Sequence, residues 1–242
     1  GVDVVGLVDA RETAPRGFAG GRVIATRGDR RGLSGLTVAV DDGTEEIVAD
    51  ALAVSGGFNP RIHLACQRGR RPVWDETVGA FLAPAGTLPT AGSAAGTATL
   101  AGTLGEGAAA ARDLLADLGI TARAAVFGPV EGDHDDAPIR PLWRVKGSRG
   151  KAFVDFQNDV HAGDLELAAR EGYDHVELAK RYTTLGMATD QGKLGNIAAI
   201  GILAETRGVT PAEVGTTTFR PFYTPVSFGA LAGPSKGKHF QP

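Results

Sequence analysis

The chain has 242 residues, of which 43% are hydrophobic and 22% charged, and its formal net charge is −3. This composition can build one or two globular domains with their own cores and excludes a largely disordered chain. The slight acidic excess argues against a nucleic-acid binder, which would gather lysine and arginine on one face. No apolar run approaches the roughly 20 residues of a membrane span, so we predict no membrane association. The single cysteine, Cys66, can form neither an internal disulfide nor a structural zinc site, which favours a reducing compartment, and we predict a cytoplasmic location.

Both ends of the sequence read as interior to larger domains. Residues 1–9 begin directly with an apolar, strand-like run, and residues 233–242 form a short polar stretch of the kind that leads into a further domain. We therefore expect a fragment of a longer subunit.

The first 120 residues are predicted to form an α/β domain. Apolar runs bounded by Gly, Asp and Arg turns predict strands at residues 2–8, 22–26, 35–40 and 46–54. Residues 104–119 have strong helix propensity and end at Gly119, which predicts a closing helix. Asp9 follows the first run, where a carboxylate in a dinucleotide-binding fold commonly bonds a ribose hydroxyl. Because the usual glycine-rich loop does not precede it here, we favour a solvated strand end for Asp9.

A glycine- and alanine-rich strand-to-helix junction follows at residues 90–111. Gly92 and Gly96 would allow the backbone to approach a ligand closely. Free N–H groups and the positive dipole end of a helix N-terminus favour a diphosphate. The residues leave a packing turn beneath a helix equally open.

Residues 121–150 read as an exposed linker with three prolines and the acidic patch Asp133-His-Asp-Asp136. Asp133, His134 and Asp136 could hold a metal ion, but a solvated loop is favoured and we predict no metal site. No histidine, cysteine or acidic residue stands in a nucleophile, acid–base or zinc spacing, so we predict no catalytic residue in this chain.

Residues 151–233 predict a small helical domain with clear start and stop signals. Asp174 with Glu177, and Thr210 with Glu213, read as capping boxes. Gly186 and Gly208 are predicted to end helices, the second of which presents an apolar face from residues 196–207. Polar residues that these signals leave unexplained cluster in loops: Lys180, Arg181, Thr183, Thr184, Asp190, Gln191, Lys193, Thr216, Thr217, Thr218 and Arg220.

Three runs of this domain carry a family resemblance: Phe153-Val-Asp-Phe-Gln-Asn-Asp-Val160, Lys180-Arg-Tyr-Thr-Thr-Leu-Gly-Met-Ala-Thr-Asp-Gln-Gly-Lys193 and Thr217-Thr-Phe-Arg-Pro-Phe-Tyr-Thr-Pro-Val226. They resemble the alpha subunit of heterotetrameric sarcosine oxidase. A related bacterioferritin-associated-ferredoxin-like domain binds an iron–sulfur cluster through four cysteines, and those positions fall here at Asp155, Gln157, Asp190 and Gly195. Such clusters are held by thiolates, so we predict no cluster.

The resemblance implies an α/β fold class: part of a two-dinucleotide-domain flavoprotein-like fold, then a small α-helical ferredoxin-associated-like domain without cluster ligands. The expected division is a partial FAD/NAD(P)-binding-like domain at 1–120, a linker at 121–150, the cluster-less helical domain at 151–233, and the start of a folate-binding domain at 234–242.

The resemblance also implies cofactors. Ser93 replaces the aspartate typical of FAD-binding relatives, and the family binds NAD in that place, so the candidate NAD contacts are Gly92, Ser93, Thr97 and Thr99. An FMN shared with a beta subunit would be contacted by Thr184, Gln191, Gly192, Lys193 and Arg220. The alternative is that the cations pair with surface acids and the threonines cap helices. FAD and zinc are expected only on partner subunits, and tetrahydrofolate on the C-terminal domain.

The function implied is support of the oxidative demethylation of sarcosine to glycine, with hydrogen peroxide formed and a one-carbon unit passed to tetrahydrofolate. The expected partners are the beta, gamma and delta subunits, and the fragment alone is expected to be inactive. Two alternatives stay open: the alpha subunit of a related opine or proline dehydrogenase, and a non-catalytic scaffold that binds a flavoprotein.

Overall fold

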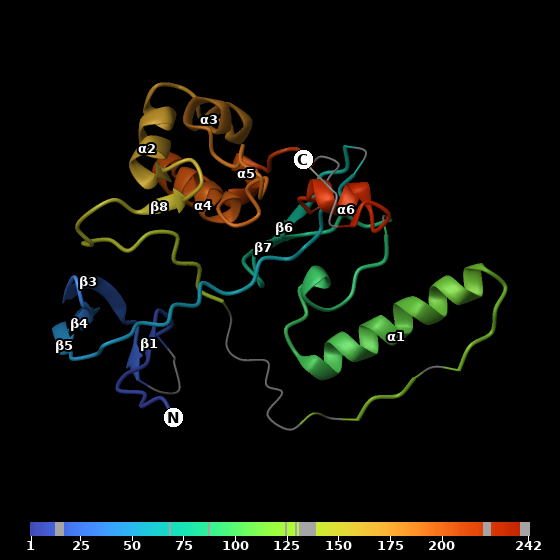
Figure 1. Cartoon of the computed structure of the whole chain (residues 1–242), viewed down its shortest axis with the longest axis horizontal. Helices are drawn as coiled ribbons and strands as arrows, with labels where there is room; N and C mark the ends of the chain where they lie inside the picture. Colours follow the sequence, from blue (N-terminus) through green and yellow to red (C-terminus); the bar gives the residue numbers. More distant parts are fainter. Residues whose placement is uncertain are drawn as a thin grey trace.

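The computed structural model describes residues 1–12, 17–67, 69–86, 88–123, 125–128, 130, 139–219 and 224–237. Over these residues the chain has a mixed α/β content, with its strands concentrated in the first half and most helices in the second (Figure 1). No helix in the described part of the chain is both long and apolar enough to cross a bilayer.

An antiparallel three-stranded sheet forms from β3 (Arg22–Asp29), β4 (Gly32–Val40) and β5 (Gly43–Ile47). Short turns connect its strands in sequence order, and the Asp29 carboxylate accepts a hydrogen bond from the Arg31 N–H at 2.7 Å in the first of them. The central strand buries Leu36 and Val38. The strands predicted at 22–26 and 35–40 are therefore confirmed and extended.

Two other strand predictions were wrong. The run at 2–8 pairs only at its end, where β1 (Val8–Asp9) lies parallel to β2 (Phe18–Ala19). The predicted strand at 46–54 ends at Ile47, and residues 48–58 lie extended and largely exposed without a paired strand among the described residues. Their sequences have strand character, but a strand forms only where a neighbour accepts its backbone hydrogen bonds.

A short hairpin, β6 (Val73–Asp75) and β7 (Ala80–Leu82), precedes the 3₁₀ helix η1 (Gly92–Ala95) and the long helix α1 (Leu100–Asp117). α1 begins four residues before the predicted start because the Thr99 hydroxyl caps it by accepting the Gly102 N–H. It ends before Gly119, which adopts φ +74°. No residue of α1 is buried, and Figure 1 shows the helix apart from the other elements.

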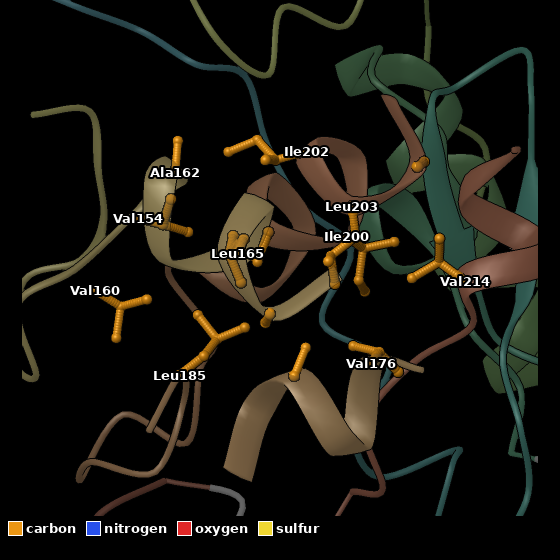
Figure 2. Close-up of a cluster of buried hydrophobic side chains, with 14 of the residues drawn as sticks. Val154, Val160, Ala162, Leu165, Val176, Leu185, Ile200, Ile202, Leu203 and Val214 are labelled. Carbon is orange, nitrogen blue, oxygen red and sulfur yellow. The ribbon is translucent and has the colours of Figure 1, made fainter. Parts of the chain in front are cut away.

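The second half is a helical unit introduced by the small antiparallel pair β8 (Phe153–Asp155) and β9 (Val160–His161). It contains α2 (Ala162–Arg170), α3 (Val176–Thr183), α4 (Asn196–Arg207), α5 (Pro211–Val214) and α6 (Phe228–Ala232). Figure 2 shows how Leu165 of α2, Leu203 of α4 and Leu185 gather in the core of this unit. All three side chains are fully buried, and α4 supplies the longest apolar run.

The helix signals were mostly right. Thr210 and Glu213 form the predicted capping box, and Gly208 ends α4 in the left-handed conformation. The cap of α3 was misassigned, because His175 rather than Asp174 accepts the Glu177 N–H. α3 also ends earlier than predicted, with Thr184 rather than Gly186 as its left-handed C-cap.

The core of the helical unit includes residues from the first half of the chain. Ile62, Cys66 and Phe81 are buried in the same cluster as Leu165 and Leu203. Burial raises the pKa of the Cys66 thiol. The β6–β7 hairpin therefore packs with the helices that follow it by about one hundred residues in the sequence.

Candidate functional site

Two loops of the helical unit contain the four positions at which cluster ligands were predicted to be replaced. The side chain of Asp155, only 6% exposed, accepts hydrogen bonds from three backbone N–H groups. One oxygen takes those of Gln157 at 2.9 Å and Asn158 at 3.2 Å, and the other takes that of Gly186 at 2.8 Å. The Asp155 carboxylate thus joins the loop after β8 to the loop after α3.

The second aspartate organises the loop in which it lies. Its two carboxylate oxygens accept the N–H groups of Gly192 at 3.0 Å and Leu194 at 3.3 Å. A further contact joins the two loops, since the Thr189 hydroxyl donates to the Gln157 side-chain oxygen at 3.2 Å. Both carboxylates therefore stabilise backbone where relatives place thiolates. In the part of the chain that the structure describes, no group of three or more His, Cys, Asp or Glu side chains could hold a metal ion.

Gly195 and Gly192 are held where a larger side chain would collide. A Cβ on Gly195 would lie 2.3 Å from the Val154 carbonyl oxygen, so no cysteine fits this position without movement of the backbone. A Cβ on Gly192, which has φ +73°, would lie 2.2 Å from the Asn196 side-chain oxygen. The fourth ligand position is thus closed by the backbone itself.

A small pocket lies beside this second loop. Its wall consists of residues from three places: Gly192, Lys193, Asn196, Ile197 and Ile200 around the start of α4; Asn59, Pro60, Ile62, His63 and Phe81 from the first half of the chain; and Thr216, Thr217 and Phe219 after α5. Its volume is about 40 Å³, space for about three water molecules. A ligand larger than this can insert only an edge or a single group.

Positive charge and apolar packing meet in this pocket. Burial, together with the nearby charges of Lys193 and Arg61, lowers the pKa of His63 to about 4, so the imidazole is neutral at physiological pH. Burial also lowers the pKa of Lys193, although Asp190 opposes this shift. The His63 ring packs edge-on against Phe219 at 4.6 Å between centroids.

The far wall of the pocket is fixed by polar contacts. The Asn196 side-chain amide donates to the Thr217 hydroxyl at 3.0 Å, and the next N–H, that of Thr218, donates to the Glu177 carboxylate at 2.7 Å. The Asn196 side-chain oxygen is buried without a hydrogen-bond partner among the described residues. A donor group entering the pocket would find this acceptor available.

The predicted flavin contacts are only partly brought together. Gly192 and Lys193 line the pocket, and Gln191, at φ +55°, is adjacent to them. Thr184 does not line it: it takes the left-handed conformation at φ +66°, and its carbonyl accepts the Asn158 side-chain amide at 3.0 Å. That conformation is unusual for a β-branched residue. Arg220 lies outside the described residues, as do Asp133, His134 and Asp136.

The sequence gave no signal for several lining residues. His63 and Phe81 precede Lys193 by more than one hundred residues, and only tertiary packing places them in one wall. Asn196 was read simply as the start of a helix. Its position between two glycines, where it blocks any side chain at Gly192, could have been suspected from the glycine spacing but not shown by it.

The predicted dinucleotide contacts lie in η1 and at the start of α1, and a carboxylate occupies their donors. Glu106 accepts the Gly92 N–H at 2.8 Å and the Thr97 hydroxyl at 2.5 Å. Thr99 is used as the cap of α1. Ser93 lies within η1 beside Gly92. Since the donors expected to face a diphosphate already bind an anion, a dinucleotide phosphate would have to displace Glu106.

Asp9, the candidate for a ribose hydroxyl, is engaged within its own turn. Its carboxylate pairs with the Arg11 guanidinium at 2.7 Å and also accepts the Arg11 backbone N–H at 2.9 Å. These hydrogen bonds lower the pKa of Asp9.

Comparison with known proteins assigns these features to a family. The sarcosine oxidase A3 domain family matches residues 149–234. Sarcosine oxidase subunit alpha of Rhizobium meliloti (strain 1021) is 54% identical over 251 residues, covering 100% of this chain and 25% of that protein. Sarcosine oxidase subunit alpha of Corynebacterium sp. (strain P-1) is 35% identical over 272 residues, covering 99% of this chain and 27% of that protein. The chain thus spans about a quarter of the length of these relatives.

The crystal structure of L-proline dehydrogenase from P. horikoshii has a similar fold, with a TM-score of 0.60 at 19% identity over 87% of this chain and 44% of that one. This likeness supports the mixed α/β assignment and concerns the fold alone. Sequence identity along the whole chain, the matched domain and the resembling loops agree. The chain therefore belongs to the family of sarcosine oxidase alpha subunits, with residues 149–234 as the A3 domain.

Proposed function

We propose that this chain is the part of a sarcosine oxidase alpha subunit that presents the A3 loops to a flavin held by a partner subunit. The assembly would demethylate sarcosine oxidatively to glycine, form hydrogen peroxide and pass the one-carbon unit to tetrahydrofolate. The observation that carries this proposal is the 54% identity to a sarcosine oxidase alpha subunit along the entire chain.

The pocket beside Lys193 supports contact with a flavin edge, not enclosure of a flavin. A volume of about 40 Å³ is far below that of a typical cofactor cavity, which is on the order of 300 Å³ or more. The residues present fit a group that arrives on another chain. Lys193 and the Gly192 backbone would face an electron-rich edge, and Asn196 would accept a hydrogen bond from it.

A flavin at this position would supply the electron-accepting chemistry, and the chain's own residues would bind and orient it. Lys193 contributes positive charge, which favours an anionic ring edge. Apolar neighbours, including Ile200 and Phe81, exclude water from the same wall. His63 stays neutral and therefore adds no second charge.

The dinucleotide part of the proposal depends on Glu106. Gly92, Ser93, Thr97 and Thr99 would contact an NAD diphosphate only after Glu106 releases the Gly92 N–H and the Thr97 hydroxyl. A Glu106→Gln variant should bind NAD more tightly than wild type, because a neutral amide repels a diphosphate less. Weaker or unchanged binding, measured by calorimetry on the intact subunit, would remove these residues from the NAD site.

The test of the proposal is reconstitution of the complex. The full-length subunit would be co-expressed with its neighbours and assayed for sarcosine-dependent hydrogen peroxide, for bound NAD and FMN, and for the flavin spectrum. Lys193→Ala should shift the flavin spectrum and lower FMN content, while Lys193→Arg should retain most of both and the exposed control Lys236→Ala should change neither. A complex without cofactors or sarcosine turnover would leave the scaffold alternative.

A second candidate, the subunit of a related amino-acid dehydrogenase, is favoured only by the shared fold with a proline dehydrogenase. Assaying sarcosine, proline and an opine with the same complex separates the two. Preference for proline or an opine would replace sarcosine as the substrate class.

A further inference from the structure

A six-residue segment between the two halves of the chain, Ile139–Arg144, contacts three separate parts of the molecule. Arg140 pairs with Glu12, near the β1–β2 pair, at 2.5 Å. Pro141 lies against the turn of the β6–β7 hairpin, since a Cβ on Gly79 would be 3.1 Å from its ring. Arg144 pairs with Glu166 of α2. The segment was predicted as an exposed linker, yet it binds at both ends and in the middle.

Trp143 makes the closest of these contacts. Its indole lies directly on the backbone of α4 at Gly201, where a Cβ would be 2.1 to 2.4 Å from three ring atoms. Every other residue type would push the ring away. Gly201 is buried in the middle of α4, a position where glycine weakens a helix relative to alanine, so the close packing gives this glycine a reason.

An aromatic series continues from Trp143 to the pocket. The Trp143 and Trp74 rings are 6.5 Å apart between centroids, and Trp74 packs edge-on against Phe81 at 5.1 Å. Phe81 lines the pocket that contains Lys193. Displacing Trp143 would therefore loosen β6–β7, the element that brings Phe81 to the pocket wall.

The ring contact outweighs the ion pairs. Both side chains of Arg140–Glu12 are more than half exposed, and those of Arg144–Glu166 are about 40% exposed. Exposed ion pairs contribute little to stability. Trp143 instead buries aromatic surface against a helix backbone and a second indole, which is the stronger kind of contact.

We propose that residues 139–144 form a clamp, and that Trp143 is a positioning residue that holds the β6–β7 hairpin, and with it the Phe81 wall of the pocket, against α4. This clamp is independent of which ligand enters the pocket. It makes the segment before the A3 domain a working part of that domain's pocket.

Hydrogen exchange measured by mass spectrometry on the intact alpha subunit in its complex tests the clamp. Two variants act on the same contact by opposite changes: Gly201→Ala adds an atom beneath the ring, and Trp143→Ala removes the ring. Both should speed exchange in residues 73–82 about tenfold or more. Trp143→Phe should restore most of the protection. Gly105→Ala in α1, which has open space around its Cα, is the matched glycine control and should leave residues 73–82 unchanged.

Wild-type exchange of residues 73–82 in Trp143→Ala would overturn the clamp, whatever Gly201→Ala does, because that variant adds no atom to α4. Loss of protection throughout α2 and α3 in Trp143→Ala would also overturn it, since the role would then be general stability. Local loss in the hairpin, rescued by phenylalanine, supports it.

Discussion

At the scale of single residues, the A3 loops show how a site can lose a cofactor and keep its shape. Asp155 accepts three backbone N–H groups from two loops, and Asp190 accepts two within its own loop. Backbone N–H groups commonly point at cluster sulfurs in iron–sulfur proteins. A buried carboxylate offers acceptors for the same kind of donors, and leaving those donors unpaired would cost free energy. The aspartates thus have a structural reason that sequence alone did not supply.

Replacing Asp155 with asparagine should destabilise the chain by roughly 1–3 kcal/mol. An amide has one accepting oxygen, so at least one of the N–H groups of Gln157, Asn158 and Gly186 would face an NH₂ group. Urea unfolding measures the change. Asp159→Asn is the control, since Asp159 is exposed with φ +54°, a conformation that asparagine tolerates. Equal stability of Asp155→Asn and wild type would contradict the role assigned to this carboxylate.

The imidazole of His63 should make stability fall with acid. Its pKa is lowered from 6.5 to about 4 in the folded chain, so between these values the unfolded chain binds more protons. The free energy of unfolding should therefore decrease as pH falls from 6.5 to 4, by less than about 1.4 kcal/mol per pH unit because the ring is partly solvent-accessible. His63→Gln should flatten this dependence in urea titrations at several pH values. A pKa for His63 near 6.5 by NMR would refute it.

At the scale of elements, α3 holds the wall of the pocket after α5. The Glu177 carboxylate accepts the Thr218 N–H with one oxygen and pairs with Arg181 through the other. Burial alone would raise the pKa of Glu177, but the hydrogen bonds from Arg181 and Thr218 outweigh it and lower that pKa. Because His175 rather than Asp174 caps the helix, Glu177 is not needed in the predicted capping box and reaches across to residue 218.

Glu177→Ala should cost about 1–3 kcal/mol, while Glu177→Gln should cost less because its amide oxygen still accepts the Thr218 N–H. Exchange of the Thr218 amide, followed by NMR, should speed up in the alanine variant and much less in the glutamine variant. The stability due to the ionised carboxylate should be present above pH 4.5 and be lost as pH falls below it. Glu205→Gln, at an exposed position of α4, serves as the control. A Thr218 amide that exchanges equally in all variants would show that Glu177 does not hold the wall.

The accuracy of sequence reasoning followed the range of the interactions involved. The capping box at Thr210 and the stop at Gly208 depend on neighbours within a few residues, and both were predicted. The strands at 2–8 and 46–54 depend on distant partners, and their apolar pattern alone did not predict the pairing. Lys193 was chosen from its loop, but His63 and Phe81 were missed because nothing local marks them as its neighbours.

At the scale of the whole molecule, the packing of the A3 domain extends beyond its matched residues 149–234. Ile62, Cys66 and Phe81 share one buried cluster with α2 and α4, and Trp143 covers Gly201. A division of the chain at residues 120 and 150, as proposed from the sequence, would separate these side chains from the core that they complete. Stability of the helical unit should therefore depend on the segment at residues 60–83.

Phe81→Ala tests this dependence directly. Phe81 is 7% exposed and belongs to the helical core although it lies in β7, so its truncation should destabilise the helical unit by about 3–5 kcal/mol. Phe58→Ala removes the same ring at a position that is 89% exposed in the described structure, and should cost little. Hydrogen exchange of residues 197–204 in α4 reports on the helical unit separately from the β3–β5 sheet. Faster exchange there in Phe81→Ala alone would show that the A3 fold needs the hairpin, whereas unchanged exchange would mean that residues 151–233 are a self-sufficient domain and that the shared core contributes no stability to it.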